Sequence, residues 1–263
     1  MDLELGGKQA LVTGSTLGIG RAIAEALLNE GASVVINGRD EDRLNRVTEE
    51  LSDLGEVFGV AADMSTSKGA EAVAAAIDGP VDILVNNAGV FEVQPFFDIT
   101  DEEWTRMFEL NVMSGVRLSR TYMEGMLSRG WGRIIFIGSD QSLKPNPVMA
   151  HYAMTKTAQV SIARSLSELT RGTGVTVNTV MAAPTWTDGV EAFMKQMAEI
   201  EDTTPEEMSK EYFADGEGRT SLLERWAHPA EIASLVTYLC SPKASATNGA
   251  AVRADGGMVR SLF

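Results

Sequence analysis

Apolar runs and amphipathic stretches alternate along the first part of the chain. Residues 10–12, 34–36 and 57–61 are short runs rich in Val, Ile, Leu and Ala, and each is followed by a segment with apolar residues at helical spacing. Short apolar strands that alternate with amphipathic helices predict a parallel sheet, because each helix carries the chain back to the same edge in a right-handed crossover.

The alternation continues through the middle of the chain. The pattern predicts three further strands and two long helical regions. The expected elements are a strand at 81–85, a long helical region at 101–127, a strand at 133–137, a second long helix at 150–170 and a strand at 175–180. We therefore expect an α/β fold, a Rossmann-type doubly wound parallel sheet.

Residues 186–225 interrupt this rhythm with a Met-rich, acidic segment that includes Phe193, Met194 and Met197. A helical insertion after the carboxyl end of a strand lies where open α/β sheets bind ligands, so we expect a helical substrate lid here. The alternative is an ordinary surface pair of helices whose Met side chains fill gaps in the core. No linker or internal repeat divides the chain, so we expect one domain over residues 1–263.

The composition is that of a globular enzyme, with 44% hydrophobic and 22% charged residues. Thirty-seven acidic and 22 basic residues give a net charge of −15, which repels nucleic-acid phosphate and anionic membrane surfaces. No apolar run reaches membrane-spanning length. We expect neither nucleic acid nor a membrane as a partner.

Cysteine and histidine are too few for several kinds of site. Cys240 is the only cysteine, which excludes an intrachain disulfide and favours a buried structural thiol. Residues 1–7 lack the basic stretch that begins a signal peptide, so we expect a cytoplasmic protein. His151 and His228 lie far apart in the sequence, so no metal site is expected.

A glycine-rich turn follows the first expected strand and opens a helix; residues 13–20 read TGSTLGIG. The first glycine allows a tight turn, the second lets the backbone approach a pyrophosphate, and the third lets the helix pack closely on the strand. The helix N-terminus would offer unpaired amides to the phosphates. We expect a dinucleotide to contact Gly14, Ser15, Thr16, Gly18, Ile19 and Gly20.

The end of the second expected strand indicates which dinucleotide. Residues 37–39 read NGR where NAD-binding proteins carry an acid for the ribose 2′-hydroxyl. Arg39 could instead pair with a 2′-phosphate through its planar fork of donors, which favours NADP(H), with NAD(H) as the alternative. Arg39 as a solvated loop residue beside Asp40 is the other interpretation.

Two later strand ends complete the expected cofactor site. Asp63, followed by Met64, comes after the third strand, where its carboxylate could accept a hydrogen bond from an adenine amino group or serve only as an exposed turn residue. The fourth strand ends in small residues that let the chain pass close to a ribose. These are Asn87, Ala88 and Gly89, within the sequence NNAG.

Tyr152 and Lys156 lie four residues apart near the start of an expected helix, so both project from one face. A phenol with a pKa near 10 is a poor proton donor and acceptor at neutral pH, and a nearby ammonium lowers that pKa by favouring the phenolate. The two residues form a candidate acid/base pair. By itself, a Tyr/Lys pair at this spacing is more often a surface coincidence.

The glycine turn, the NNAG sequence, Asn111, Ser139 and the Tyr152-x-x-x-Lys156 pattern together resemble the short-chain dehydrogenase/reductase family. The resemblance spans nearly the whole chain and is greatest to 3-oxoacyl-carrier-protein reductase-like members. Ser139 ends the fifth expected strand at the family's spacing before the tyrosine.

The resemblance implies a role for each of these residues. In reduction, Tyr152 would protonate the substrate oxygen while Ser139 hydrogen-bonds it. Lys156 would hold the nicotinamide ribose and lower the tyrosine pKa, and Asn111 would help to position a water between the lysine and solvent. Tyr152 and Lys156 would therefore also contact the cofactor. Oxidation of an alcohol would follow the same path in reverse.

One segment departs from the family pattern. Where the family usually has Pro-Gly near the nicotinamide, residues 181–185 read MAAPT. Alanine does not easily adopt the positive φ that glycine allows, so we expect a different turn at Ala182 and Ala183. We still expect Thr185 and Thr187 to contact the cofactor.

The expected function is NAD(P)(H)-dependent hydride transfer between a nicotinamide and a small-molecule carbonyl or secondary alcohol. A 3-oxoacyl thioester or small ketone is the first choice of substrate, and a sugar, polyol or other alcohol the second. Asp140, Gln141 and Lys144 could line a polar substrate site or be ordinary loop residues. A non-catalytic dinucleotide sensor is a third alternative. The resemblance also implies a homotetramer or homodimer that pairs through the two long helices.

Overall fold

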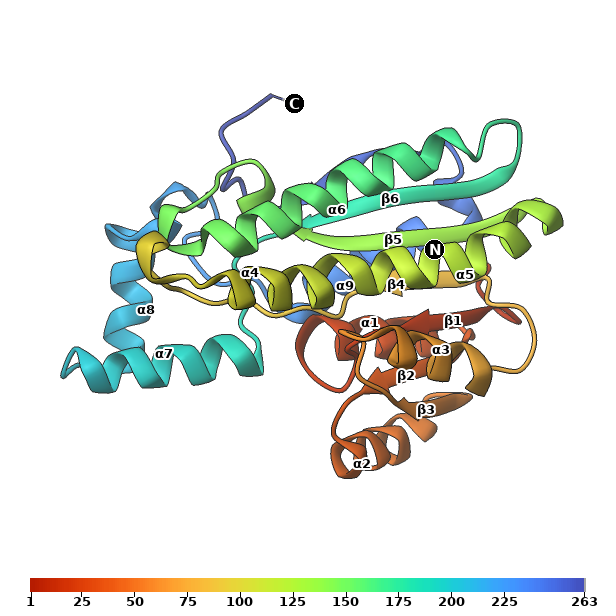
Figure 1. The fold of residues 1–263 in the computed structure, drawn as a ribbon, viewed down its shortest axis with the longest axis horizontal. Helices are drawn as coiled ribbons and strands as arrows, with labels where there is room; N and C mark the ends of the chain where they lie inside the picture. Colours follow the sequence, from red (N-terminus) through yellow and green to blue (C-terminus); the bar gives the residue numbers. More distant parts are fainter. Residues whose placement is uncertain (263) are drawn as a thin grey trace.

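The computed structural model describes residues 1–262, which build a seven-stranded parallel sheet between two layers of helices (Figure 1). The strand order is β3-β2-β1-β4-β5-β6-β7, so the winding direction reverses between β1 and β4. This order confirms the expected doubly wound α/β fold, in which ligands generally bind outside the carboxyl ends of the strands where the winding direction reverses. The strands are β1 (Gln9–Val12), β2 (Ser33–Gly38), β3 (Val57–Ala61), β4 (Ile83–Asn86), β5 (Trp131–Ser139), β6 (Gly174–Ala182) and β7 (Ala251–Ala254).

Helices cover both faces of the sheet, which explains why the central strands are apolar throughout rather than alternating. One face carries α1 (Gly18–Asn29), α2 (Glu41–Ser52) and α9 (Pro229–Cys240), and the other carries α3 (Ser67–Ala76), α5 (Ser114–Arg129) and α6 (Ala150–Glu168).

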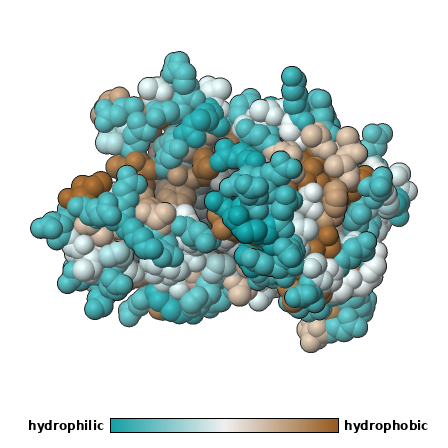
Figure 2. Space-filling view, turned by 90° about the horizontal axis from the view of Figure 1, so that it is seen from below, coloured by the Kyte–Doolittle hydropathy of each residue, from teal (hydrophilic) through white to brown (hydrophobic). Residues whose placement is uncertain are grey.

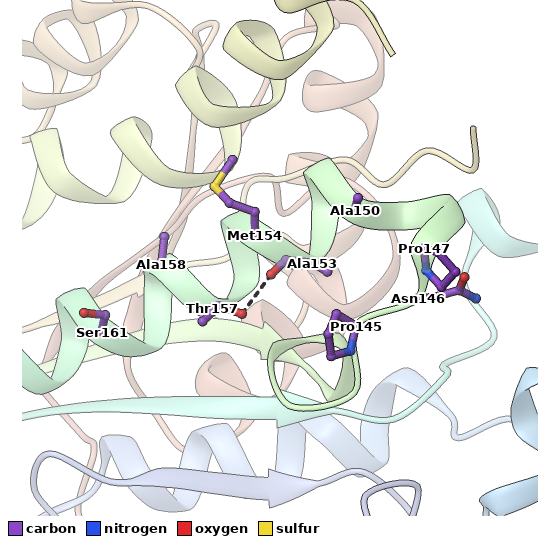
Figure 3. A pocket seen from close by; sticks show the side chains of 9 residues that line it. All are labelled: Pro145, Asn146, Pro147, Ala150, Ala153, Met154, Thr157, Ala158 and Ser161. Atoms are coloured by element: carbon purple, nitrogen blue, oxygen red, sulfur yellow. Dashed lines mark hydrogen bonds between the residues drawn. The ribbon is translucent and has the colours of Figure 1, made fainter. Parts of the chain in front are cut away.

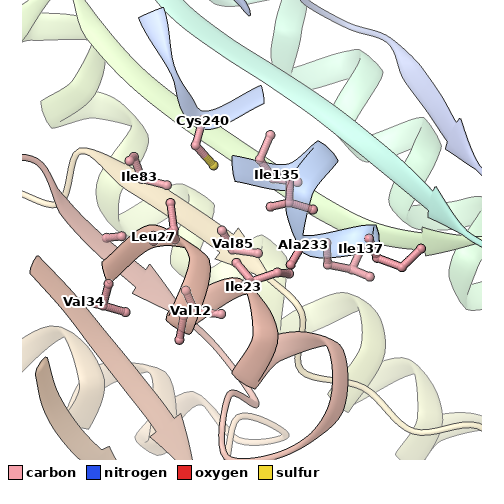
Figure 4. Packing of buried hydrophobic residues seen from close by; sticks show 14 of the residues in the cluster. Val12, Ile23, Leu27, Val34, Ile83, Val85, Ile135, Ile137, Ala233 and Cys240 are labelled. Carbon is pink, nitrogen blue, oxygen red and sulfur yellow. The ribbon is translucent and has the colours of Figure 1, made fainter. Parts of the chain in front are cut away.

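The core under α1 and α9 is close-packed (Figure 4). Ile23 and Leu27 of α1 lie in one buried cluster with Val85 of β4 and Ala233 of α9. Cys240 belongs to the same cluster, and burial raises the pKa of its thiol to about 12. The expectation of a buried structural cysteine is therefore confirmed, because so little thiolate forms at neutral pH.

The helical region expected at 101–127 is not one helix. The structure has α4 (Asp101–Phe108), a π-helical segment η2 (Glu109–Met113), and then α5. A π-helical turn inserts a residue into the helix and is frequent at functional sites. Asn111 lies within this segment.

The segment at 186–225 contains α7 (Asp188–Ile200), α8 (Pro205–Ala214) and the 3-10 element η5 (Glu217–Thr220). These helices extend from one end of the molecule in Figure 1, and the view from below in Figure 2 shows apolar side chains at that same end. The expected helices are present, and their action as a lid stays a prediction.

Short 3-10 elements complete the chain: η1 (Phe96–Asp98), η3 (Asp140–Ser142), η4 (Pro147–Met149) and η6 (Pro242–Ala244). Within residues 1–262, no helix has the length and apolar character that crossing a bilayer requires.

Candidate active site

The glycine turn between β1 and α1 has the shape that a pyrophosphate needs. Gly14 and Gly18 have φ values of 60° and 55°, in the left-handed region that favours glycine. A Cβ atom at Gly14 would lie 2.9 Å from the Cα of Ala88, and one at Gly20 would collide with the carbonyl oxygen of Gly14. Only glycine therefore fits this cradle, and the residues present are suited to a dinucleotide phosphate.

Asn87 and Ala88 brace the glycine turn from the neighbouring strand. The Nδ2 of Asn87 donates to the carbonyl oxygens of Thr13 and Gly14, both at 2.9 Å. The Oγ1 of Thr13 in turn accepts hydrogen bonds from the backbone amides of Asn87 and Ala88. The bracing role of Thr13 was not expected from the sequence.

The N-terminus of α1 meets the first turn of α7. The N-cap residue of α1 is Leu17, whose apolar side chain accepts no hydrogen bond from the first amides of the helix. Instead, the carboxylate of Asp188 accepts a hydrogen bond from the amide of Gly18 at 3.2 Å. Thr187, the N-cap of α7, lies close to Gly18, and its expected contact with the cofactor stays a prediction.

The segment that replaces Pro-Gly has an ordinary backbone. In the described part of the chain, the positive-φ residues other than glycine are Glu4, Asp202 and Glu224, so Ala182 and Ala183 adopt no left-handed conformation. β6 continues through Ala182, and the amide of Ala183 donates to the carbonyl of Ala254. Thr185 is buried, and its hydroxyl donates to the carbonyl of Ala183 at 2.8 Å, an internal bond rather than an open contact.

The end of β2 holds a structural asparagine and an exposed arginine. Asn37 is buried; its Oδ1 accepts from the amide of Gly14 at 3.3 Å and its Nδ2 donates to the carbonyl of Val60 at 3.0 Å. Arg39 is exposed, and within residues 1–262 its guanidinium forms no ion pair. Its guanidinium is therefore free to bind an anion at this strand end. Thr16 of the glycine-rich turn packs against Gly38 at the end of β2.

Asp63 and Met64 follow β3 and lie in different surroundings. The Oδ1 of Asp63 accepts from the amide of Ser65 at 3.0 Å, which closes a local turn. Met64 is buried in the core cluster beneath α3 and α5, whereas Ile19 of α1 is only partly buried. Contact of these residues with a cofactor stays a prediction.

β5 and α6 bring Ser139, Tyr152 and Lys156 together. Lys156 is buried, its Nζ donates to the carbonyl of Ile137 in β5 at 2.7 Å, and the same nitrogen lies 5.6 Å from the centre of the Tyr152 ring. Burial raises the pKa of Tyr152, and a side-chain hydrogen bond with Ser139 opposes that increase, which places the two hydroxyl groups in contact. Three groups with acid/base and hydrogen-bonding chemistry thus meet at the carboxyl edge of the sheet.

The expected lowering of the tyrosine pKa by the lysine is wrong for this structure. Burial raises the pKa of Tyr152 to about 12, and the charge of Asp140 adds to the increase against the effect of Ser139. Burial also lowers the pKa of Lys156 to about 8. Removing both groups from water disfavours their charged forms, and the charge of Lys156 is not among the causes that shift the pKa of Tyr152.

Asn111 acts as a brace at the π-helical turn. Its Oδ1 accepts from the amide of Val90 and its Nδ2 donates to the carbonyl of Val90, both at 2.9 Å. The Nδ2 also lies 3.1 Å from the Oγ1 of Thr155 in α6, and the backbone carbonyl accepts from the Nε2 of Gln159 at 2.5 Å. Asn111 thereby joins the loop after β4 to α6. Its part in a water relay to Lys156 stays a prediction.

A second set of polar groups follows Ser139. The hydroxyl of Ser139 donates to the Oδ1 of Asp140 at 3.0 Å. Burial raises the pKa of Asp140 to about 6; the hydroxyl of Ser139 and the charge of Lys144 oppose this effect. The sequence left open whether Asp140 lines the substrate site or is an ordinary loop residue. The structure places its carboxylate in contact with the hydroxyl of Ser139.

Glu217 of η5 ties the far segment to the loop after β5. Its carboxylate accepts hydrogen bonds from the Nε2 of Gln141 at 3.3 Å and from the Nδ2 of Asn146 at 2.5 Å. The Nζ of Lys144 lies 3.6 Å from the Oε1 of Glu217 and donates to its backbone carbonyl at 3.0 Å. Sequence spacing contained no signal for this long-range contact.

The two histidines lie apart from these groups. His151 is fully buried and stacks edge-on with Trp104, and His228 is the N-cap residue of α9. Within residues 1–262, no three His, Cys, Asp or Glu side chains converge as a metal site would require. The absence of a metal centre stays a prediction.

An apolar groove of about 530 Å³ runs along α6 (Figure 3). Ala150, Met154 and Ala158 contribute to its lining, and it includes neither Tyr152 nor Lys156. Ser139 is also absent from its lining, so the groove is separate from the three candidate catalytic residues. Pairing of the long helices in an oligomer stays a prediction.

Comparisons with known proteins agree on one family. The family model described as short chain dehydrogenase matches residues 8–198. An uncharacterized oxidoreductase, YvrD, of Bacillus subtilis is 48% identical, with 100% of both chains covered. The 3-oxoacyl-[acyl-carrier-protein] reductase FabG of Vibrio cholerae is 35% identical, covering 97% of this chain and 99% of that protein.

Two solved structures are similar over nearly the whole chain. L-sorbose reductase from Gluconobacter frateurii, complexed with NADPH and L-sorbose, has a TM-score of 0.94 at 32% identity, with 100% of both chains covered. A 3-oxoacyl (acyl-carrier-protein) reductase from Agrobacterium tumefaciens with NADP bound has a TM-score of 0.87 at 29% identity, covering 97% of this chain and 96% of that one.

Proposed function

Because this chain belongs to the short-chain dehydrogenase family, we propose that it reduces a small-molecule ketone with NADPH, with Tyr152 as the proton donor. The convergence of Ser139, Tyr152 and Lys156 at the carboxyl edge of the sheet carries this proposal. The glycine cradle ends β1 at the same edge, and parallel strands gather such groups around one crevice.

The bound nicotinamide supplies the hydride in reduction and accepts it in oxidation. Tyr152 gives its phenolic proton to the substrate oxygen as negative charge develops there. A pKa of about 12 keeps this phenol protonated at neutral pH, yet it is still a far stronger acid than an alcohol. Oxidation of an alcohol would run through the same residue in reverse, with the phenolate as the base.

Ser139 and Lys156 support this transfer. The hydroxyl of Ser139 turns from Asp140 to donate to the substrate oxygen and stabilises its growing charge. Lys156, held by the carbonyl of Ile137, carries its ammonium charge below about pH 8 and binds ribose hydroxyl groups. Asn111 keeps α6 and the loop after β4 in register.

The cradle of Gly14, Gly18 and Gly20 would hold the pyrophosphate, and Arg39 would bind a 2′-phosphate. The NADPH in the L-sorbose reductase and the NADP in the A. tumefaciens reductase support NADP(H) as the cofactor. We also propose that α7, α8 and η5 cover the bound substrate, that the protein is cytoplasmic, and that it assembles as a homotetramer or homodimer.

The relatives support two substrate classes, a keto-sugar and a 3-oxoacyl thioester. A sugar or polyol dehydrogenase with the same residues is therefore the second candidate. A dinucleotide sensor has less support, because the acid, the hydrogen-bond donor and the lysine are all present in one place.

The test is NADPH oxidation with a panel of ketones, 3-oxoacyl thioesters and keto-sugars. Tyr152→Phe should lower kcat by at least about 100-fold and leave the NADPH dissociation constant unchanged. Tyr122→Phe is the matched control, since Tyr122 is also a buried phenol whose pKa is raised to about 12, but it lies in α5 away from Ser139. Near-normal turnover by Tyr152→Phe would refute its role as the acid.

A further inference from the structure

Asp140 is a buried carboxyl group at the reacting end of the site. It directly follows Ser139 at the end of β5, and its side chain is only 4% exposed. Its Oδ1 lies 3.0 Å from the Oγ of Ser139, the group that is expected to bind the substrate oxygen. Burying a carboxylate is costly unless other groups donate hydrogen bonds to it, so its presence here calls for a physical reason.

The partners of Asp140 do not saturate its two oxygens. Within residues 1–262, Oδ1 accepts from Ser139 and Oδ2 accepts from the Nε2 of Gln141 at the long distance of 3.5 Å, and the backbone amide of Gln141 also acts on the carboxylate. In the described part of the chain no lysine or arginine forms an ion pair with it, because Lys144 is committed to Glu217 and Thr220. An ionised carboxylate accepts about four hydrogen bonds, so this one retains capacity for a further donor.

Asp140 also acts electrostatically on the acid and on the far segment. Its negative charge raises the pKa of Tyr152 in α6 and that of Tyr212 in α8. Both phenols therefore lie within electrostatic reach of the carboxylate. A substrate enclosed between α8 and Tyr152 would meet the carboxylate at its edge.

We propose that Asp140 is a specificity-determining residue that accepts a hydrogen bond from a hydroxyl group on the carbon next to the reacting carbonyl. The distance between Ser139 and Asp140 sets the geometry. When Ser139 binds the carbonyl oxygen, the carboxylate of Asp140 lies at most about two hydrogen-bond lengths from that oxygen. A hydroxyl on the neighbouring carbon lies about one such length from the carbonyl oxygen, and so fits between it and Asp140.

This arrangement names the substrate class of the proposed reductase, on which it rests: a neutral hydroxyketone such as a keto-sugar. A carboxylate only accepts hydrogen bonds, so it selects a donor at that carbon. A methylene group at that carbon would remove the carboxylate of Asp140 from water without donating a hydrogen bond to it. A carboxylate at that carbon would be repelled by the charge of Asp140. The same contact disfavours both 3-oxoacyl groups and 2-oxo acids.

The experiment compares kcat/KM with NADPH for 1-hydroxybutan-2-one, butan-2-one and 2-oxobutanoate, which differ at the carbon next to the ketone. In the wild-type protein we expect the hydroxyketone to exceed butan-2-one by at least about tenfold and the oxo acid to be slowest. Asp140→Ala should reduce the first ratio by about tenfold or more. Asp140→Asn should give an intermediate ratio, because its amide oxygen still accepts.

Asp215→Asn is the control, because Asp215 is an exposed acid just after α8, and its ratio should equal that of the wild type. The wild-type order of the three substrates tests the inference even if a variant does not fold. Equal rates with butan-2-one and the hydroxyketone, or an unchanged ratio in Asp140→Ala, would overturn the inference and leave the proposed function intact. No turnover of any ketone in the wider panel would overturn both.

Discussion

The carboxylate of Asp188 accepts a hydrogen bond from the backbone amide of Gly18, at 3.2 Å. Gly18 begins α1, whose N-terminal amides and positive dipole end are the expected binding site for the cofactor pyrophosphate. Asp188 begins α7, the first helix of the segment expected to cover the substrate. An anionic group of the protein therefore lies where an anionic part of the cofactor is expected to bind.

We predict that Asp188→Asn binds NADPH about 3- to 10-fold more tightly than the wild type, because a competing negative charge is removed from the end of α1. Titration of NADPH by fluorescence or calorimetry measures this change. Glu191→Gln removes the same charge one turn later on α7, where the side chain pairs with Lys195, and should leave affinity unchanged. Equal affinities of wild type and Asp188→Asn would contradict competition at Gly18.

Arg39 should determine the choice between NADPH and NADH. Arg39→Leu is expected to raise the dissociation constant for NADPH by at least about tenfold, because only NADPH has a 2′-phosphate for the guanidinium, and to change that for NADH little. Arg43→Leu is the control, since Arg43 lies nearby on α2 and faces Asp40 at 3.7 Å. The same loss for both cofactors would remove the basis for assigning NADP(H).

Glu217 should hold the far segment against the loop after β5. Glu217→Ala removes the acceptor for Gln141 and Asn146, so we expect amide hydrogen exchange across residues 205–220 to become about tenfold faster. Mass spectrometry of peptides from this segment provides the measurement. Glu211→Ala removes an exposed acid from the same helix pair and should not change the exchange. Unaltered exchange in Glu217→Ala would mean that other contacts hold the segment.

Asp140 should make stability depend on pH. Its pKa of about 6 in the folded protein is above the ordinary 3.8, so the folded state binds the proton more tightly than the unfolded state does. The resulting stabilisation is present below about pH 4 and is lost as pH rises through about 6. Asp140→Asn has no titrating group at this position and so does not lose this stabilisation. Its free energy of unfolding relative to the wild type should therefore increase by up to about 3 kcal/mol between about pH 4 and pH 7.

Thermal unfolding at pH 4, 5, 6 and 7 would measure the difference between the two proteins. Asp40→Asn serves as a control of opposite sign, because the amide of Arg43 lowers the pKa of Asp40 at the start of α2. The stability of Asp40→Asn relative to the wild type should therefore not increase as the pH rises. A constant difference between Asp140→Asn and wild type across the range would show that Asp140 does not titrate as a buried acid.

Local sequence patterns were enough to predict the sheet and the cofactor turn. Strand and helix periodicities act over a few residues, and the requirement for glycine at Gly14 and Gly18 comes from the backbone of the turn itself. Boundaries were less accurate: the fifth strand, expected at 133–137, is Trp131–Ser139. The long helix expected from residue 101 also contains a π-helical turn, in which Asn111 contacts α6 and the loop after β4, and neither contact can be read from local spacing.

The sequence by itself determined the fold, the glycine-rich turn after β1 and the pairing of Tyr152 with Lys156, because each depends on spacing within one element or one turn. Only the tertiary structure decided the electrostatics of that pair, since burial raises the pKa of one member and lowers that of the other. It also decided that Asp188 reaches Gly18 and that Glu217 reaches Gln141. Those contacts join segments far apart in the chain, and their distances exist only once the helices have packed on the sheet.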